Sequence, residues 1–133
     1  MNQAMSGRLH FLNPKELPEP SAALSHGVVA GDMIFVAGQC GVDEQGGTVG
    51  VGDIAEQTRQ AIANMEIVLV AGGFALTAVV YVTAFLVDLD DFDAYDRAYA
   101  EAFGDHRPAR ATVRADLHSV DLLVEIQAIA RKA

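Results

Sequence analysis

The stretch at residues 78–87, AVVYVTAFLV, constrains the fold of this chain more than any other. Its residues are apolar at both odd and even positions and include many β-branched and aromatic side chains. Successive side chains of a strand point to opposite faces of a sheet. The pattern therefore predicts a strand that is covered on both of its faces.

Two segments with helical spacing flank this strand. At residues 54–71 the apolar side chains recur every three or four positions, which predicts a helix with one apolar stripe. Asp53 precedes it and can cap its first turn. A second helix is predicted over residues 92–103, with Asp90 or Asp91 as its cap.

Further strands are predicted on both sides of the helices. They are short runs rich in β-branched and apolar residues, and the first two are separated by Gly31-Asp32, a pair typical of a tight hairpin turn. Residues 1–25, which hold three of the four prolines, are expected to form an irregular lead-in. The predicted strands are residues 27–30, 33–37, 109–115 and 122–130.

The expected order is three strands, a helix, a strand, a helix and two strands, although only two of the first three strands can be placed. This order predicts one α+β domain over residues 1–133, because the chain is too short for two ordinary domains. Two helices can cover one face of such a sheet and leave the other exposed. An exposed apolar face of that size needs a partner. We therefore expect a homo-oligomer that packs sheet against sheet.

Composition excludes several functions. The net charge is -9, which opposes binding to the phosphates of nucleic acids. Apolar runs are much shorter than a membrane-spanning helix, and the N-terminus lacks the apolar region of a signal peptide. We therefore expect a soluble, cytoplasmic protein. A single cysteine, Cys40, allows no intrachain disulfide.

Arg110 is the first candidate for a functional side chain. It follows Arg107-Pro108-Ala109 at the start of a predicted strand, where alternation puts Arg110, Thr112 and Arg114 on one face. An arginine beside small residues leaves space for a ligand carboxylate, which its planar fork can bind with two hydrogen bonds. A solvent-exposed or salt-bridged arginine fits the same spacing.

Glu125 is the second candidate. It stands in the otherwise apolar stretch 123–129, and a charge in such a stretch must face a cation, a cavity or an interface. A carboxylate in a cavity can orient or deprotonate a water molecule. A structural ion pair or a polar sheet face are the alternatives.

Histidine and cysteine give weaker signals. The four histidines show no metal-binding spacing, so no metal site is predicted. His26 precedes an apolar strand and can line a pocket or serve as a hydrogen-bonded structural residue. Cys40 has no adjacent base in the sequence, which indicates a small buried thiol rather than a nucleophile.

Five segments, in this order, resemble the RidA (YjgF-type) family of reactive-intermediate enamine and imine deaminases across nearly the whole chain. The segments are GDMIFVAGQ at 31–39, QTRQ at 57–60, VDLDDF at 87–92, RPAR at 107–110 and VEIQAIA at 124–130.

The resemblance implies a fold like that of the Bacillus-type chorismate mutases. Such a fold has a mixed six-stranded sheet with two helices on one face, and it forms homotrimers with sites at the clefts between subunits. It also implies roles for individual residues. Arg110 would bind the substrate carboxylate, Glu125 would position water, and backbone groups near Gly38 and Thr112 would shape the site. No metal or organic cofactor is implied.

The sequence departs from the family pattern at three positions. Leu24 stands where many members have a tyrosine, Thr112 where many have a cysteine, and Asp96 where an asparagine is common. The loss of the tyrosine hydroxyl affects substrate identity more than reaction type, because Arg110 and Glu125 are retained. His26 can take the place of that hydroxyl as a polar wall.

The function implied by the resemblance is hydrolysis of 2-imino acids to 2-keto acids and ammonia. A non-catalytic trimer that binds small carboxylate metabolites is one alternative, and the change at Leu24 keeps it open. A deaminase dedicated to an aminoacrylate-type intermediate is another.

Overall fold

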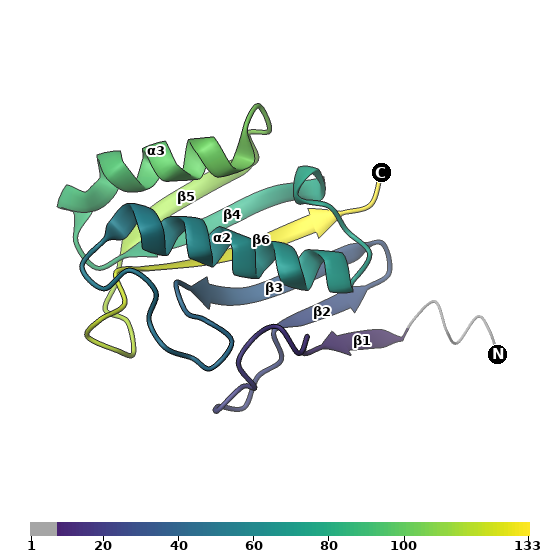
Figure 1. Cartoon of the computed structure of the whole chain (residues 1–133). Helices are drawn as coiled ribbons and strands as arrows, with labels where there is room; N and C mark the ends of the chain where they lie inside the picture. The colour runs from purple at the N-terminus through teal and green to yellow at the C-terminus, as the bar shows by residue number, and fades with distance from the viewer. Residues whose placement is uncertain (1–7) are drawn as a thin grey trace.

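The strand β6 (Val124–Arg131) lies at the centre of a six-stranded sheet with the order β1-β2-β3-β6-β4-β5 (Figure 1). It pairs antiparallel with β3 (Met33–Cys40) on one side and with β4 (Val79–Leu86) on the other. Among the strand pairs of residues 8–133, only β4 and β5 (Ala109–Arg114) run parallel, so the sheet is mixed, as the resemblance implied. The computed structural model describes residues 8–133.

Two helices cover one face of this sheet (Figure 1). The first, α2 (Ile54–Ala71), has the predicted bounds, and the side chain of Asp53 accepts a hydrogen bond from the backbone N–H of Glu56 at 3.0 Å. The second, α3 (Phe92–Phe103), also has the predicted bounds. Asp91 is its N-cap residue, but its side chain makes no capping hydrogen bond. A 3-10 turn, η2 (Leu89–Asp91), leads into α3 instead.

The expected order of strands and helices is confirmed, and the strand that the sequence could not place lies within the lead-in. Within the segment expected to be irregular, β1 (Leu9–Leu12) pairs antiparallel with β2 (Gly27–Ala30) at the sheet edge. Its side chains are exposed or only half-buried, so backbone hydrogen bonds hold it in the sheet. Because neither of its faces is buried, its sequence shows no alternation of apolar and polar residues. The first seven residues of the expected lead-in lie outside the described residues.

The other predicted strands are confirmed with small shifts at their ends. The hairpin between β2 and β3 turns at Gly31, whose φ of 64° lies in the left-handed region that glycine adopts readily. The third strand runs on to Cys40, three residues beyond the predicted end. A 3-10 turn, η1 (Leu76–Ala78), precedes β4.

The core lies between the sheet and the two helices. Alternate residues of β4 and β6, such as Val82, Leu86 and Ile126, are fully buried against it. No segment within residues 8–133 covers the opposite face of the sheet, and Phe35 and Tyr81 there remain 44% and 39% exposed. A shallow hollow of about 380 Å³ lies on this open face. Residues 8–133 therefore bury β4 on one face, and packing of another molecule on its open face stays a prediction.

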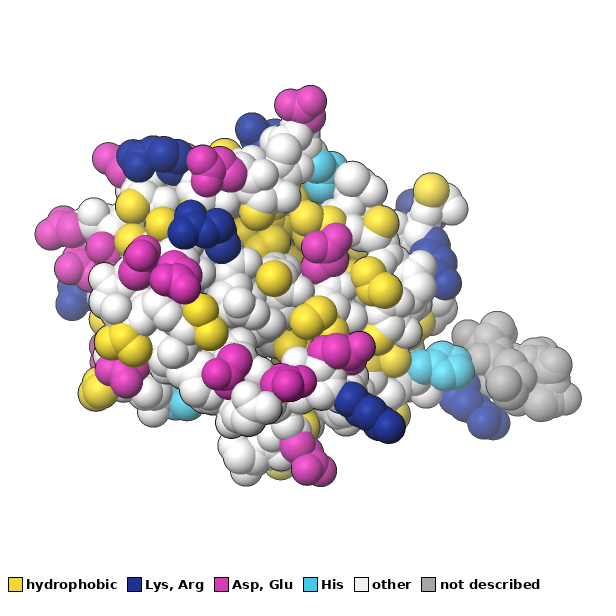
Figure 2. Space-filling model, in the orientation of Figure 1, with side chains coloured by type: hydrophobic (Ala, Val, Ile, Leu, Met, Phe, Trp, Pro, Cys, Tyr) yellow, Lys and Arg dark blue, Asp and Glu magenta, His cyan; other side chains and the backbone are white. Residues whose placement is uncertain are grey.

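The surface matches the acidic composition. Acidic side chains are spread over the face that carries the helices (Figure 2). No helix in residues 8–133 is both long and apolar enough to cross a membrane.

The buried side chain of Gln57 ties α2 to the segment before β6. Its amide nitrogen donates to the carbonyls of Gly50 and Asp121 at 3.1 and 2.9 Å, and its carbonyl accepts from the N–H of Leu123 at 2.9 Å. Three hydrogen bonds from one fully buried amide fix the start of β6 against the helix.

Replacement of this amide is expected to destabilise the protein. Gln57→Ala would leave a buried N–H and two carbonyls without partners, so we expect a loss of about 2–4 kcal/mol in the free energy of unfolding. Urea unfolding would measure it, with Arg59→Ala on the exposed side of α2 as the control. Equal stability of the two variants would contradict this role of Gln57.

Candidate active site

Arg110 lies on the edge strand β5 and faces α3. It pairs with Val82 of β4, and paired residues of neighbouring strands point to the same face of a sheet. Its guanidinium carbon lies 4.5 Å from the ring centre of Tyr99, 5.3 Å from that of Tyr95 and 5.7 Å from that of Phe92. These distances are within the range of cation–π attraction, so three aromatic rings of α3 hold the guanidinium in place.

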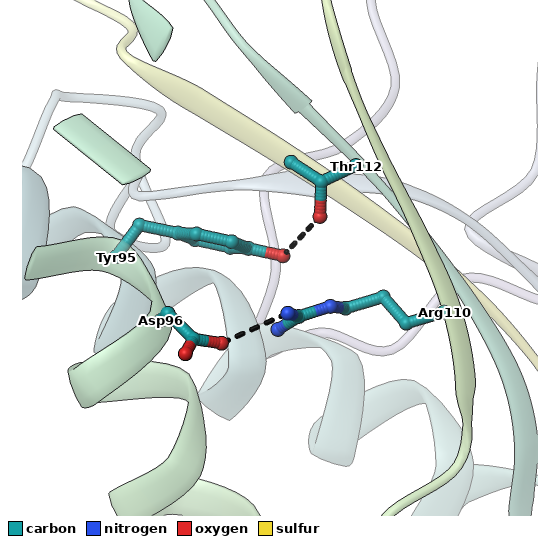
Figure 3. Close-up of polar contacts among 4 residues, drawn as sticks. All are labelled: Tyr95, Asp96, Arg110 and Thr112. Carbon is teal, nitrogen blue, oxygen red and sulfur yellow. Dashed lines mark hydrogen bonds and ion pairs between the residues drawn. The ribbon is translucent and has the colours of Figure 1, made fainter. Parts of the chain in front are cut away.

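Arg110 is also paired with a carboxylate. Its Nη2 lies 2.8 Å from Oδ1 of Asp96 on α3 (Figure 3), so the salt-bridged alternative is present in this structure. The side chains are 22% and 47% exposed, so solvent reaches both. Burial lowers the pKa of Arg110, but the hydrogen bond and charge of Asp96, together with Tyr95 and Tyr99, outweigh it and raise the pKa. The guanidinium is therefore a permanent cation.

Thr112 belongs to the same group of side chains. Its hydroxyl lies 3.1 Å from the hydroxyl of Tyr95, which points to it from α3 (Figure 3). Burial is the main reason why the pKa of Tyr95 is raised, and it raises the pKa of Tyr99 to about 12. Both phenols are therefore neutral at physiological pH. The name arginine cluster is used below for Arg110, Asp96, Tyr95, Tyr99 and Thr112.

A hollow of about 420 Å³ adjoins the arginine cluster. Its size suits a small metabolite. Arg107 contributes a second guanidinium to the lining, and this group donates a hydrogen bond to the carbonyl of Gly104. With the guanidinium groups of Arg107 and Arg110 against the carboxylate of Asp96, the lining carries more positive than negative charge. The residues that line it are Asp96, Tyr99, Ala100, Arg107, Pro108 and Arg110.

Glu125 lies on the open face of the sheet. It alternates with buried Val124 and Ile126 in β6 and is opposite Cys40 of β3. The thiol of Cys40 donates a hydrogen bond to Glu125 Oε1 at 3.5 Å. Burial, and then the charge of Glu125, raises the pKa of Cys40 to about 12. Cys40 is thus a neutral hydrogen-bond donor to the carboxylate.

Gly38 gives Glu125 its space. The strand β3 is irregular between Val36 and Gln39, and Gly38 lies in this irregularity. A Cβ atom at position 38 would meet Cγ of Glu125 at 2.8 Å, which is too close for two carbon atoms. A side chain at position 38 would therefore displace the Glu125 carboxylate from this place. The name glutamate cluster is used below for Glu125, Gly38 and Cys40.

His26 is held by hydrogen bonds on both ring nitrogens. Nε2 lies 2.7 Å from the carbonyl of Pro18, and Nδ1 lies 3.2 Å from the amide nitrogen of Gln39. Nε2 donates and Nδ1 accepts in the tautomer that satisfies both contacts. His26 thus joins the lead-in to the end of β3. Leu24 is 51% exposed in the segment before β2.

The predicted site residues fall into two groups on opposite faces of the sheet. Arg110 and Thr112 face α3, whereas Glu125 and Gly38 lie on the open face. Sequence reasoning did not find the contact between Glu125 and Cys40, because the two residues are 85 positions apart. The four-residue spacing of Tyr95 and Tyr99 was a usable signal for a shared helix face toward Arg110.

Within the described part of the chain, no group of three histidine, cysteine or acidic side chains could hold a metal ion.

Comparison with known proteins gives consistent matches over most of the chain. The profile of a family described as endoribonuclease L-PSP matches residues 14–132. A RutC family protein of Pyrococcus horikoshii is 41% identical over 86% of this chain and 91% of its own length. The 3-aminoacrylate deaminase RutC of Acinetobacter baylyi is 35% identical over 88% of this chain and 93% of its own length. The human 2-iminobutanoate/2-iminopropanoate deaminase is 31% identical over 90% and 87%.

Solved structures give the same result. A structure from Thermotoga maritima superposes with a TM-score of 0.86 at 39% identity and covers 93% of this chain and 98% of its own. The YjgF gene product of E. coli superposes with a TM-score of 0.86 at 30% identity and covers 93% and 99%. The two helices on a mixed six-stranded sheet are therefore an arrangement that these proteins share.

The protonation state of Cys40 gives a test of the glutamate cluster. Since its pKa is about 12, the native thiol is almost wholly protonated at mildly alkaline pH and should react with a disulfide reagent about 100-fold or more slower than the unfolded chain. Glu125→Gln removes the negative charge, so the pKa of Cys40 should fall and the reaction should begin at lower pH. Reaction rates followed across pH would show this shift, and an unchanged profile would contradict the contact.

Proposed function

Because the chain belongs to the endoribonuclease L-PSP family, which is the YjgF/RidA family, we propose that it hydrolyses 2-imino and enamino acids to 2-keto acids and ammonia. The observation that carries the proposal is Arg110, a permanent cation that three aromatic rings hold beside an open hollow. The names of the human and Acinetobacter relatives, which are imine and enamine deaminases, support it.

The chemistry assigned to these residues is simple. The carboxylate of a 2-imino acid binds the guanidinium of Arg110. Glu125 accepts a hydrogen bond from a water molecule and directs it to the electrophilic imine carbon. The water oxygen forms the new carbonyl, and the nitrogen leaves as ammonia. The reaction involves no oxidation or reduction, so positioning of the reactants and acid–base assistance are sufficient for it.

The placement of the two clusters favours a site built by two copies of the chain. Arg110 and Glu125 lie on opposite faces of one sheet, with β4 between their strands. A second copy packed on the apolar open face would bring its own edge strand toward Glu125. Since Phe35 and Tyr81 leave that face apolar, we propose a homotrimer with one site at each subunit cleft.

A 3-aminoacrylate substrate is compatible with the same groups, because it also carries a carboxylate and a hydrolysable nitrogen. The RutC relative of Acinetobacter supports this second candidate. Parallel assays with iminobutanoate and aminoacrylate would separate the two by their kcat/KM values. A non-catalytic carboxylate-binding trimer would bind keto acids through Arg110 but accelerate neither reaction.

We propose no ribonuclease function, despite the family description. The net charge of -9 opposes the approach of a phosphate backbone.

Loss of the guanidinium is expected to abolish deamination. Arg110→Ala should lower kcat/KM about 100-fold or more, because the substrate carboxylate loses its charged partner. Arg110→Lys keeps the charge without the planar fork and should retain a small part of the activity. Keto-acid formation from an imine generated by an amino-acid oxidase would measure both. Full activity of Arg110→Ala would refute the assignment.

Co-expression of two inactive variants tests the shared site. If one copy supplies Arg110 and its neighbour Glu125, random mixing of Arg110→Ala and Glu125→Gln chains should restore about a quarter of the sites. A site within one chain would gain nothing from mixing. The control is Arg110→Ala mixed with the double variant, which contains no chain able to complement it.

A further inference from the structure

The ion pair between Arg110 and Asp96 has features that stability does not explain. Asp96 is 47% exposed, and an ion pair this open to solvent contributes little to folding. The pair lines the hollow beside the arginine cluster, where a ligand can reach both members. Its location therefore points to a role in binding.

Both charges keep free hydrogen-bonding capacity. Arg110 has five N–H donors, and within residues 8–133 its one ion-pair partner is Asp96, which is bound at Nη2. The second oxygen of Asp96 has no hydrogen-bond partner among the described side chains. A cation and an anion thus lie side by side, each able to take a further partner.

This arrangement complements one chemical class. A 2-imino acid in its protonated form has a negative carboxylate and a positive nitrogen on adjacent carbon atoms. Its carboxylate suits Arg110, and its nitrogen suits the carboxylate of Asp96 next to it. The keto-acid product has the carboxylate but no charged nitrogen.

We propose that Asp96 is a specificity-determining residue that recognises the positively charged nitrogen of the substrate. The proposal rests on the proposed function, because it takes Arg110 as the carboxylate anchor. It also gives a physical reason for product release. Once the nitrogen has left, the remaining keto acid faces Asp96 with two like charges close together, which weakens its binding.

Stable ligands can test this without turnover. 2-Aminobutanoate has the carboxylate and the charged nitrogen, whereas 2-oxobutanoate has the carboxylate alone. Calorimetric titration of the native protein should show 2-aminobutanoate binding about tenfold more tightly. In Asp96→Asn the preference should reverse, with weaker binding of the amino acid and tighter binding of the keto acid.

Asp93→Asn is the matched control. Asp93 lies one turn earlier on α3, is exposed, and loses the same charge on substitution. It should keep the native preference, which separates the local contact from a general change in net charge. Circular dichroism of each variant would confirm that it folds.

The outcomes distinguish the two proposals. If Asp96→Asn tightens the binding of both ligands equally, Asp96 only competes with the ligand carboxylate for Arg110, and the inference is overturned. If it weakens both equally, Asp96 only orients Arg110, and the inference is again overturned. If the native protein binds neither ligand, or if Arg110→Ala binds both normally, the carboxylate anchor itself is wrong and both proposals fall.

Discussion

The pairing of β6 with strands on both of its sides determines the rest of this structure. Once β6 is fixed between β3 and β4, side-chain alternation assigns every residue of these strands to the helix face or to the open face. Glu125 goes to the open face for this reason. Through β4 the same register extends to β5 and sends Arg110 toward α3. A one-residue shift of β6 would move Glu125 to the helix face, and the same shift of β5 would move Arg110 to the open face.

Two polar residues of α2 secure this register. Gln57 holds the segment before β6, and Asn64 donates to the carbonyls of Cys40 and Val42 at 3.0 and 2.9 Å. Their amides thus fix the ends of the two strands that carry the glutamate cluster. The helix positions the candidate site although it contributes no side chain to it.

Local patterns in the sequence predicted what depends on local structure. Apolar periodicity gave α2 its bounds, and the two-sided apolar run identified β4. The strand β1 was expected in number but could not be placed, because its side chains are not buried and leave no alternation. The resemblance pointed to Arg110 and Glu125, but it did not indicate that Asp96 is bonded to Arg110 or Cys40 to Glu125. Such contacts depend on how segments distant in the sequence pack together, and local sequence patterns do not reveal this packing.

The position of β6 in the sheet also bears on how the protein folds during synthesis. The central strand comes after every other strand in the chain, so β3 and β4 leave the ribosome before the strand that joins them exists. Until then, each presents an unpaired edge that can associate with other chains. Closure of the sheet brings together residues far apart in sequence, which is a slow step in folding. The nascent chain therefore passes through a stage in which β3 and β4 each have one edge open to other chains.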